Sequence, residues 1–177
     1  MRWRGTKAEL LAALNKLPGV LSNAEPDPYG LSIVFMAEVG AAALRCVYDD
    51  FRAKSDGGTG RDGVKWADLA ESTLERRRAK GIVHDAILRE TEALRQSLEP
   101  GSMAPGQVFR LEQGSVTVGS EIPYADHHQN GTPRMPARPI VPVDGAIPPG
   151  WEAELQEGAA RGMEKVLELV CYYGGVG

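Results

Sequence analysis

The chain has 177 residues, enough for one domain with a sizeable hydrophobic core, and its 42% hydrophobic and 25% charged residues are ordinary for a soluble protein. Its net charge of −4 argues against a general nucleic-acid-binding protein, because such proteins usually carry an excess of basic residues. We therefore expect no sequence-specific nucleic-acid partner.

The cysteines and the apolar runs limit the cellular setting. Cys46 and Cys171 lie far apart and form no CxxC pair, which predicts two buried free thiols; a disulfide within or between chains stays open. No apolar segment follows the basic N-terminus, so no signal peptide is expected. The most apolar run, 31–44, contains Glu38 and is shorter than the roughly 20 residues of a membrane span, so no membrane partner is expected either.

Two helices are expected in the first third of the chain. Thr6 and Glu9 have the spacing of a capping box, and the first helix should end at Pro18-Gly19. A second, long helix is predicted over about 31–54. Its polar residues recur on one narrow stripe, and the rest of its circumference is apolar. The stripe consists of Glu38, Arg45, Asp49 and Arg52.

The middle of the chain alternates loops and short helices. The composition of 55–63 is that of a flexible loop. Ser72 and Glu75 predict a capped helix that stops at Gly81 and whose exposed face is basic. Thr91 is expected to cap another helix that ends at Leu98. The basic face consists of Arg76, Arg77, Arg78 and Lys80.

The second half predicts a β-hairpin, a short helix and a terminal helix. Two alternating stretches, 107–112 and 115–118, are joined by Gln113-Gly114. A short segment over 123–129 stops at Asn130-Gly131. The last helix should begin near Trp151, and its interior glycines, Gly158 and Gly162, favour close backbone packing.

These elements predict an α+β fold, in which a small antiparallel β-sheet carries a long packed helix, with N- and C-terminal helical additions. The expected domain organisation is an N-terminal helix and loop arm over 1–30, a core domain over 31–145 and a C-terminal helix over 146–177.

No combination of residues predicts an enzyme. His127 and His128 are adjacent and so point apart on a helix, His84 is isolated, and no further histidine follows to complete a nuclease site. Nucleophile-elbow and P-loop motifs are absent from the sequence, and the pair Asp49-Asp50 is expected to face water. We therefore predict no catalytic residue, no cofactor and no metal ligand.

The segment 132–139 is instead suited to contact. Its three prolines favour an extended arm, and Arg134 and Arg138 should project from it as donors to carboxylates on another surface. Arg76 and Arg77 are candidates for contact with an acidic partner, although a merely solvated face is the alternative. Tyr124 is expected to anchor the short helix on the sheet, or to pack in the core.

Several motifs in the central part occur in a recognisable order. Trp66-x-x-Leu69 and the basic helix come first, followed by Ile87-Leu88, Thr91 and Leu94-x-x-Ser97-Leu98. The most specific part comes next and consists of Val116-Thr117-Val118-Gly119-Ser120, Pro123-Tyr124-Ala125, His128-Gln129-x-Gly131 and Pro136-Ala137-Arg138-Pro139. This pattern, over about 64–141, resembles the phage virion morphogenesis family, which includes tail-completion proteins of Mu-like and P2-like phages and is similar to HK97-type neck and tail components. Two positions depart from the family pattern, since Glu92 follows the threonine and Ile140-Val141 follow Arg-Pro.

The resemblance implies a structural protein of a tailed bacteriophage, acting in head–tail joining (the neck) or tail completion as a subunit of an oligomeric ring. The implied partners are further copies of the chain, the connector or adaptor, and the tail tube or terminator. Its implied location is the head–tail junction of the virion, and the host cytoplasm during assembly. The alternatives are a tail terminator, a head-side morphogenesis protein or a small metal-dependent hydrolase or nuclease.

Overall fold

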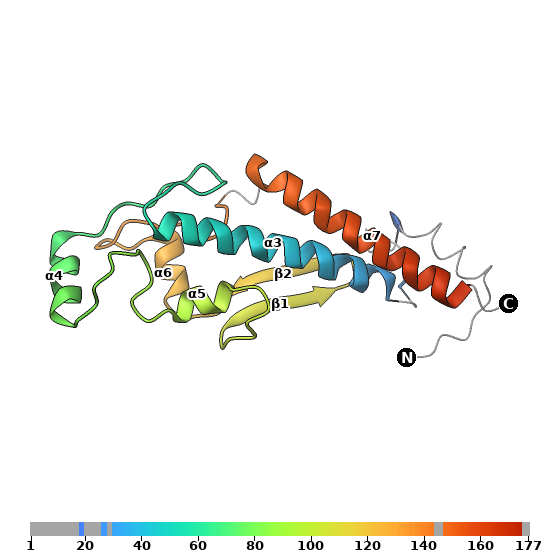
Figure 1. Ribbon diagram of the computed structural model, residues 1–177, viewed down its shortest axis with the longest axis horizontal. Helices are drawn as coiled ribbons and strands as arrows, with labels where there is room; N and C mark the ends of the chain where they lie inside the picture. The colour runs from blue at the N-terminus through green and yellow to red at the C-terminus, as the bar shows by residue number, and fades with distance from the viewer. Residues whose placement is uncertain (1–17, 20–25, 28–29, 144–146, 175–177) are drawn as a thin grey trace. The chain divides into compact units, whose positions relative to one another are not determined.

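A computed structural model of the chain describes residues 18–19, 26–27, 30–143 and 147–174 (Figure 1). The N-terminal helix predicted from Thr6 lies outside these residues, except for its expected end. Pro18 and Gly19 are themselves helical, and the prediction that the helix ends there stays a prediction, because the residues that follow lie outside the described part of the chain.

The described elements have the predicted α+β composition. The helices are α3 (Leu31–Ser55), α4 (Glu71–Ala79), α5 (Ala93–Leu98), α6 (Ala125–Asn130), the 3-10 turn η1 (Pro149–Trp151) and α7 (Glu152–Gly174), and the strands are β1 (Gln107–Glu112) and β2 (Ser115–Ser120). The two strands pair as a hairpin in one two-stranded sheet, and α3 packs against it. The predicted fold class is confirmed.

Helix α3 begins where a side chain satisfies its first amide groups. The carboxylate of Asp27 accepts hydrogen bonds from the backbone amides of Leu31 at 2.9 Å and Ser32 at 2.7 Å. An acidic group at this end also interacts favourably with the helix dipole. By length and composition alone α3 could cross a membrane, a test that the core helix of a soluble protein also passes.

The chain divides into two compact units. Helix α3, the β-hairpin and helix α7 each contribute residues to both units. The first unit draws on Met1–Ala42, Phe109–Thr117 and Leu155–Gly177, and the second on Ala43–Val108 and Val118–Glu154. The predicted three-part division of the chain stays a prediction.

The first unit packs through small residues. A Cβ atom added at Gly40 of α3 would lie 2.5 Å from a methyl of Val116 on β2, so only glycine allows this approach of helix and sheet. One added at Gly158 would lie 2.6 Å from the Cβ of Ala42, and one at Gly162 would lie 2.9 Å from a backbone oxygen of α3. The predicted close packing at the glycines of α7 is confirmed.

The second unit combines an aromatic core with buried charges. Phe51 and Trp66 pack edge to face with ring centroids 5.3 Å apart, and Leu94 and Leu98 of α5 are fully buried, as predicted. Two charged residues of α3, Asp50 and Lys54, are 1% and 0% exposed. The prediction that Asp50 faces water is therefore wrong, whereas its neighbour Asp49 has a side chain that is 55% exposed.

The loop after α3 is organised by those buried charges. Asp50 accepts hydrogen bonds from the Trp151 indole at 2.7 Å and from the backbone amide of Arg61 at 2.8 Å. Lys54 forms an ion pair with Asp62. The composition of 55–63 suggested a flexible loop, but these contacts hold it against the end of α3 because buried charges require partners.

Two predicted caps are also wrong. Helix α4 is capped at Ala70 without a side-chain hydrogen bond, so Ser72 lies inside the helix. Helix α5 is preceded by Glu92 in the left-handed region, with φ 58°, so Thr91 is not its cap. In both cases the helix is present where the sequence predicted it, and only its first residue differs.

Candidate interaction site

All five residues predicted to make contacts line one pocket in the second unit. The pocket has a volume of about 600 Å³ and lies between α4 with the residues just before it, residues 88–91, α6 with Tyr124 before it, and the segment 134–138. We call it the arginine pocket, after Arg76, Arg77, Arg134 and Arg138. Tyr124 completes the predicted set.

Arg138 forms part of the wall of this pocket. It is 6% exposed, and its guanidinium donates to the backbone oxygen of Ala67 at 3.0 and 3.2 Å and to that of Asp68 at 3.2 Å. Its own amide donates to the backbone oxygen of His128 at 2.7 Å. The prediction that Arg138 projects from a free arm is therefore wrong, because the segment is folded back onto α6.

Arg77 is buried in the same way. It is 4% exposed and donates from Nη1 to the backbone oxygen of Ala86 at 2.7 Å. Its Nε is buried without a hydrogen bond, and the nearest carboxylate oxygen, on Glu90, is 3.9 Å away. The predicted fully exposed basic face of α4 is wrong at this position.

The other two arginines remain at the surface. Arg76 has a side chain that is 61% exposed and lies 3.8 Å from a Glu90 oxygen. Arg134 is exposed, and among the described residues its guanidinium has no ion-pair partner. These two side chains are the ones that an approaching molecule would meet first.

Tyr124 stands at the rim rather than in the core. It is 38% exposed, its ring meets that of His128 edge to face at 5.8 Å, and its hydroxyl lies 3.3 Å from Oγ1 of Thr91. The prediction that it packs in the core is wrong. It provides an apolar wall with a polar tip, a combination that is common at interfaces.

The electrostatics of the pocket follow from burial. Desolvation, together with the nearby charge of Arg77, lowers the pKa of Arg138 below its usual range. Desolvation also lowers the pKa of His128 from its ordinary 6.5, with help from Arg138 and His127. The Nδ1 atom of His128 is buried without a hydrogen bond. Burial and neighbouring positive charge therefore both act against the charged form of His128 and Arg138.

Gln129 is a residue that sequence reasoning left without a role. Its side-chain oxygen accepts from the backbone amides of Ile140 at 2.7 Å and Val141 at 3.1 Å, and its amide donates to the backbone oxygen of Val141 at 2.9 Å. A glutamine on a short helix before Asn130-Gly131 gave no signal for this, because its partners lie more than ten residues away.

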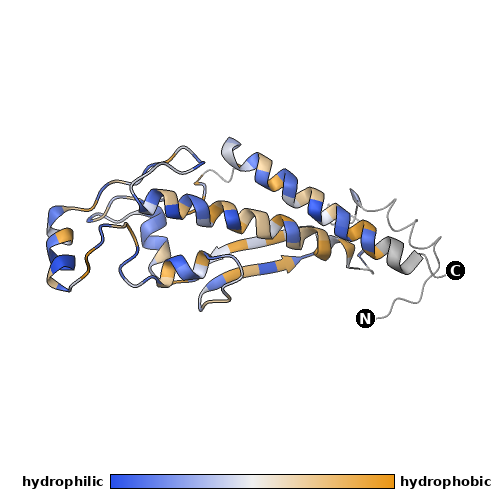
Figure 2. Ribbon diagram, viewed as in Figure 1, coloured by the Kyte–Doolittle hydropathy of each residue, from blue (hydrophilic) through white to orange (hydrophobic). Residues whose placement is uncertain are grey.

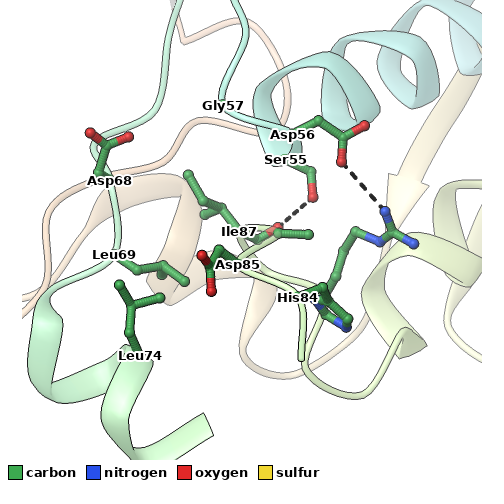
Figure 3. Close-up of a pocket in the computed structure, with 11 residues that line it drawn as sticks. Ser55, Asp56, Gly57, Asp68, Leu69, Leu74, His84, Asp85 and Ile87 are labelled. Carbon is green, nitrogen blue, oxygen red and sulfur yellow. Dashed lines mark hydrogen bonds and ion pairs between the residues drawn. The ribbon is translucent and has the colours of Figure 1, made fainter. Parts of the chain in front are cut away.

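A second pocket, of about 580 Å³, lies beside the end of α3 (Figure 3). In it Ser55 donates to the backbone oxygen of Ile87 at 2.7 Å, and Asp56 lies 3.5 Å from the Arg89 guanidinium. His84 also lines this pocket and is exposed. Within the described ranges, no group of three His, Cys, Asp or Glu side chains is placed to hold a metal ion.

Cys46 is a buried free thiol. Desolvation raises its pKa to about 11, so it is protonated at neutral pH. The side chain of Cys171 lies outside the described residues, and a pairing that involves it stays a prediction.

Comparison with known proteins found no matching family model, no matching curated protein and no matching solved structure.

Proposed function

We propose that this chain is a structural virion protein of a tailed bacteriophage, acting at the head–tail junction in joining or tail completion as a subunit of an oligomeric ring. The proposal rests on one observation above all. Three of the motifs that carry the resemblance, which are separated in the sequence, are hydrogen-bonded to one another in the second unit, and each contributes a residue to its arginine pocket.

The interlocking can be followed bond by bond. The Pro136–Pro139 motif meets the His128-Gln129 motif through the amide of Arg138 and the backbone oxygen of His128. It meets the Trp66 motif through the indole of Trp66, which donates to the backbone oxygen of Pro139 at 2.9 Å. Residues used in this way hold backbone segments in place. That role suits a protein that works by contact.

The chemistry of these residues also supports a contact role. The polar side-chain groups of Arg138, Gln129 and Trp66 form hydrogen bonds with backbone atoms. In these bonds none of the three side chains is placed to act as a nucleophile, acid or base. The surface groups of the pocket include arginines and a tyrosine, which are enriched in protein interfaces. A ring built from such a subunit needs a heterologous contact, in which one patch binds a different patch of the next copy.

The test is genetic and structural. The gene would be deleted from the phage or prophage that encodes it, and the lysate imaged by electron microscopy. We expect filled heads and unattached tails, and restored particles when the protein is supplied from a plasmid. Normal infectious particles, or particles in which mass spectrometry finds no trace of the protein, would overturn the proposal.

Imaging also separates the two structural alternatives. A tail terminator would leave tails of irregular length when deleted, and a head-side protein would leave heads that fail to retain DNA. Density for the protein in the neck of intact particles is the outcome that the proposal predicts.

A further inference from the structure

The arginine pocket carries an excess of positive charge. Four arginines line it, against two carboxylates, on Asp68 and Glu90. Glu90 is already engaged, since its oxygen accepts from Lys80 at 2.7 Å, and this bond lowers the pKa of Glu90. In a chain whose net charge is −4, this is a local concentration of the opposite sign.

Burial strengthens the electrostatic interaction between these arginines and a group that enters the pocket. Arg77 and Arg138 are 4% and 6% exposed and donate mainly to backbone oxygens. Because little water screens them, their field acts on whatever enters. The Nε of buried Arg77 makes no hydrogen bond, and its nearest carboxylate oxygen, on Glu90, is 3.9 Å away. A carboxylate is the group that such a site would bind, flanked by apolar atoms to match Leu88, Met135 and Tyr124.

The exposed face of α7 combines apolar side chains with negative charge, whereas the pocket combines apolar side chains with positive charge. Met163 and Leu167 are 36% and 46% exposed there, and Glu164 and Glu168 lie beside them. Along α7 hydrophobic and hydrophilic residues alternate (Figure 2). The two glutamates are four residues apart on one helix, so their like charges repel until a cation lies between them.

We propose that the arginine pocket of one copy of this chain binds the acidic face of α7, defined by Met163, Glu164, Leu167 and Glu168, of the next copy. The two surfaces differ, so the contact is heterologous and repeats from copy to copy, as a ring requires. The assignment of this contact to a ring in the virion rests on the proposed function, whereas the contact itself does not.

A second copy fits better than nucleic acid. A phosphate backbone is bound by a stripe of exposed basic side chains, but here two of the four arginines are buried in the wall of the pocket. The pocket also has apolar walls, which match Met163 and Leu167 and have no counterpart along a phosphate backbone. Arg76 and Arg134, whose side chains are exposed, would be the first to meet an incoming acidic helix.

The test is a charge-reversal cycle on the full chain. One variant carries Arg76→Glu and Arg134→Glu, both exposed, and a second carries Glu164→Lys and Glu168→Lys. Self-association is followed by sedimentation velocity and native mass spectrometry over a range of concentrations. We expect each variant to associate at least about tenfold more weakly than the unchanged chain, because attraction becomes repulsion at each contact.

Two recombinations decide the matter. An equimolar mixture of the two variants, and a single chain carrying all four substitutions, should both recover association, since opposite charges then face each other again. Association that stays weak in both would overturn the proposal. So would undiminished association of the single variants, or an unchanged chain that stays monomeric up to about 1 mM. Binding of poly-dT by the unchanged chain that is lost in the arginine variant, with no recovery of association in the mixture, would mean a nucleic-acid site and would also overturn it.

Matched controls change the same charge elsewhere. Arg78→Glu with Arg110→Glu, and Glu75→Lys with Glu112→Lys, alter exposed residues outside the pocket and outside the α7 face. Both controls should associate as the unchanged chain does. The two proposals also fail separately: charge-dependent association of a protein missing from particles overturns only the proposed function, and charge-independent association of a neck protein overturns only this contact.

Discussion

The two halves of α3 are held by different physics. From Leu31 to Ala42 the helix lies in the first unit. Glycines of α3 and α7 allow close approach there, and the contacts are van der Waals packing. From Ala43 to Ser55 it lies in the second unit, where buried Asp50 and Lys54 bind the following loop. Small changes of side-chain volume in a packed region cost modest amounts of stability, whereas removing the partner of a buried charge is strongly destabilising. The same helix should therefore respond very differently to substitution along its length.

The largest expected effect comes from removing a buried charge. Asp50→Ala leaves the indole of Trp151 and the amide of Arg61 without their acceptor. We expect a loss of about 4 kcal/mol in the free energy of unfolding, or about 10 °C in Tm, measured by urea and thermal denaturation. Asp49→Ala is the matched control: this carboxylate is 55% exposed and pairs with Arg61 at the surface, so its loss should be under about 1 kcal/mol. Equal losses would show that Asp50 is not the organising group.

The shape-packed half should respond less. Gly158→Ala places a methyl 2.6 Å from the Cβ of Ala42, which forces a small separation of α7 and α3 and should reduce the free energy of unfolding by about 1–2 kcal/mol. In the double variant with Ala42→Gly that contact is relieved. A double-mutant cycle should then give a favourable coupling of about 1 kcal/mol. Additive losses would contradict the close approach of these two residues.

Acidification should act on the second unit through His128. Its pKa is lowered in the folded chain, so the unfolded chain takes up a proton first as the pH falls through 6.5. Stability is therefore complete above that pH and declines below it, before Glu90, whose lowered pKa acts below 4.5, contributes. We expect Tm to fall less between pH 7.5 and 5.5 in His128→Gln than in the unchanged chain. His127→Gln, at an exposed neighbour, should retain most of the decline, because the charge of His127 is the smallest of the three causes that lower the pKa of His128.

The smallest effect is on reactivity. With a pKa of about 11 and no exposure, Cys46 should react slowly with a thiol reagent in a Cys171→Ser background, because reaction needs both a thiolate and an opening of the second unit. Asp50→Ala should accelerate the labelling of Cys46 more than Gly158→Ala does at matched stability. Equal acceleration would indicate that both halves of α3 open together.

Local patterns in the sequence were sufficient for the type and place of each described α-helix and strand, but not for the 3-10 turn η1. The period of apolar residues placed α3 and α7, and the alternation around Gln113-Gly114 placed the hairpin. Helix caps were predicted less well. Thr91 and Ser72 have the right chemistry but not the right backbone position, because capping depends on where the preceding loop turns.

For the candidate site, the sequence predicted which residues take part but not which of them are buried. Five interface residues were singled out from the sequence, and all five line one pocket, but the sequence placed Arg77 and Arg138 on the outside. An arginine carries the same charge in water and in a pocket wall, so composition cannot tell the two apart. Backbone oxygens of Ala67 and Ala86, brought close only by the folded chain, decide which arginines are buried.

Asp50 gives the plainest instance. Beside Asp49 it has the same chemistry and nearly the same local context, and the sequence alone assigned both to water. Which of the two turns inward is decided by the arrival of Trp151 from 101 residues away. Periodicity depends on residues that are neighbours along the chain, so a single sequence is enough to detect it. The partner of a buried polar group can come from any part of the chain, so only the folded structure identifies it.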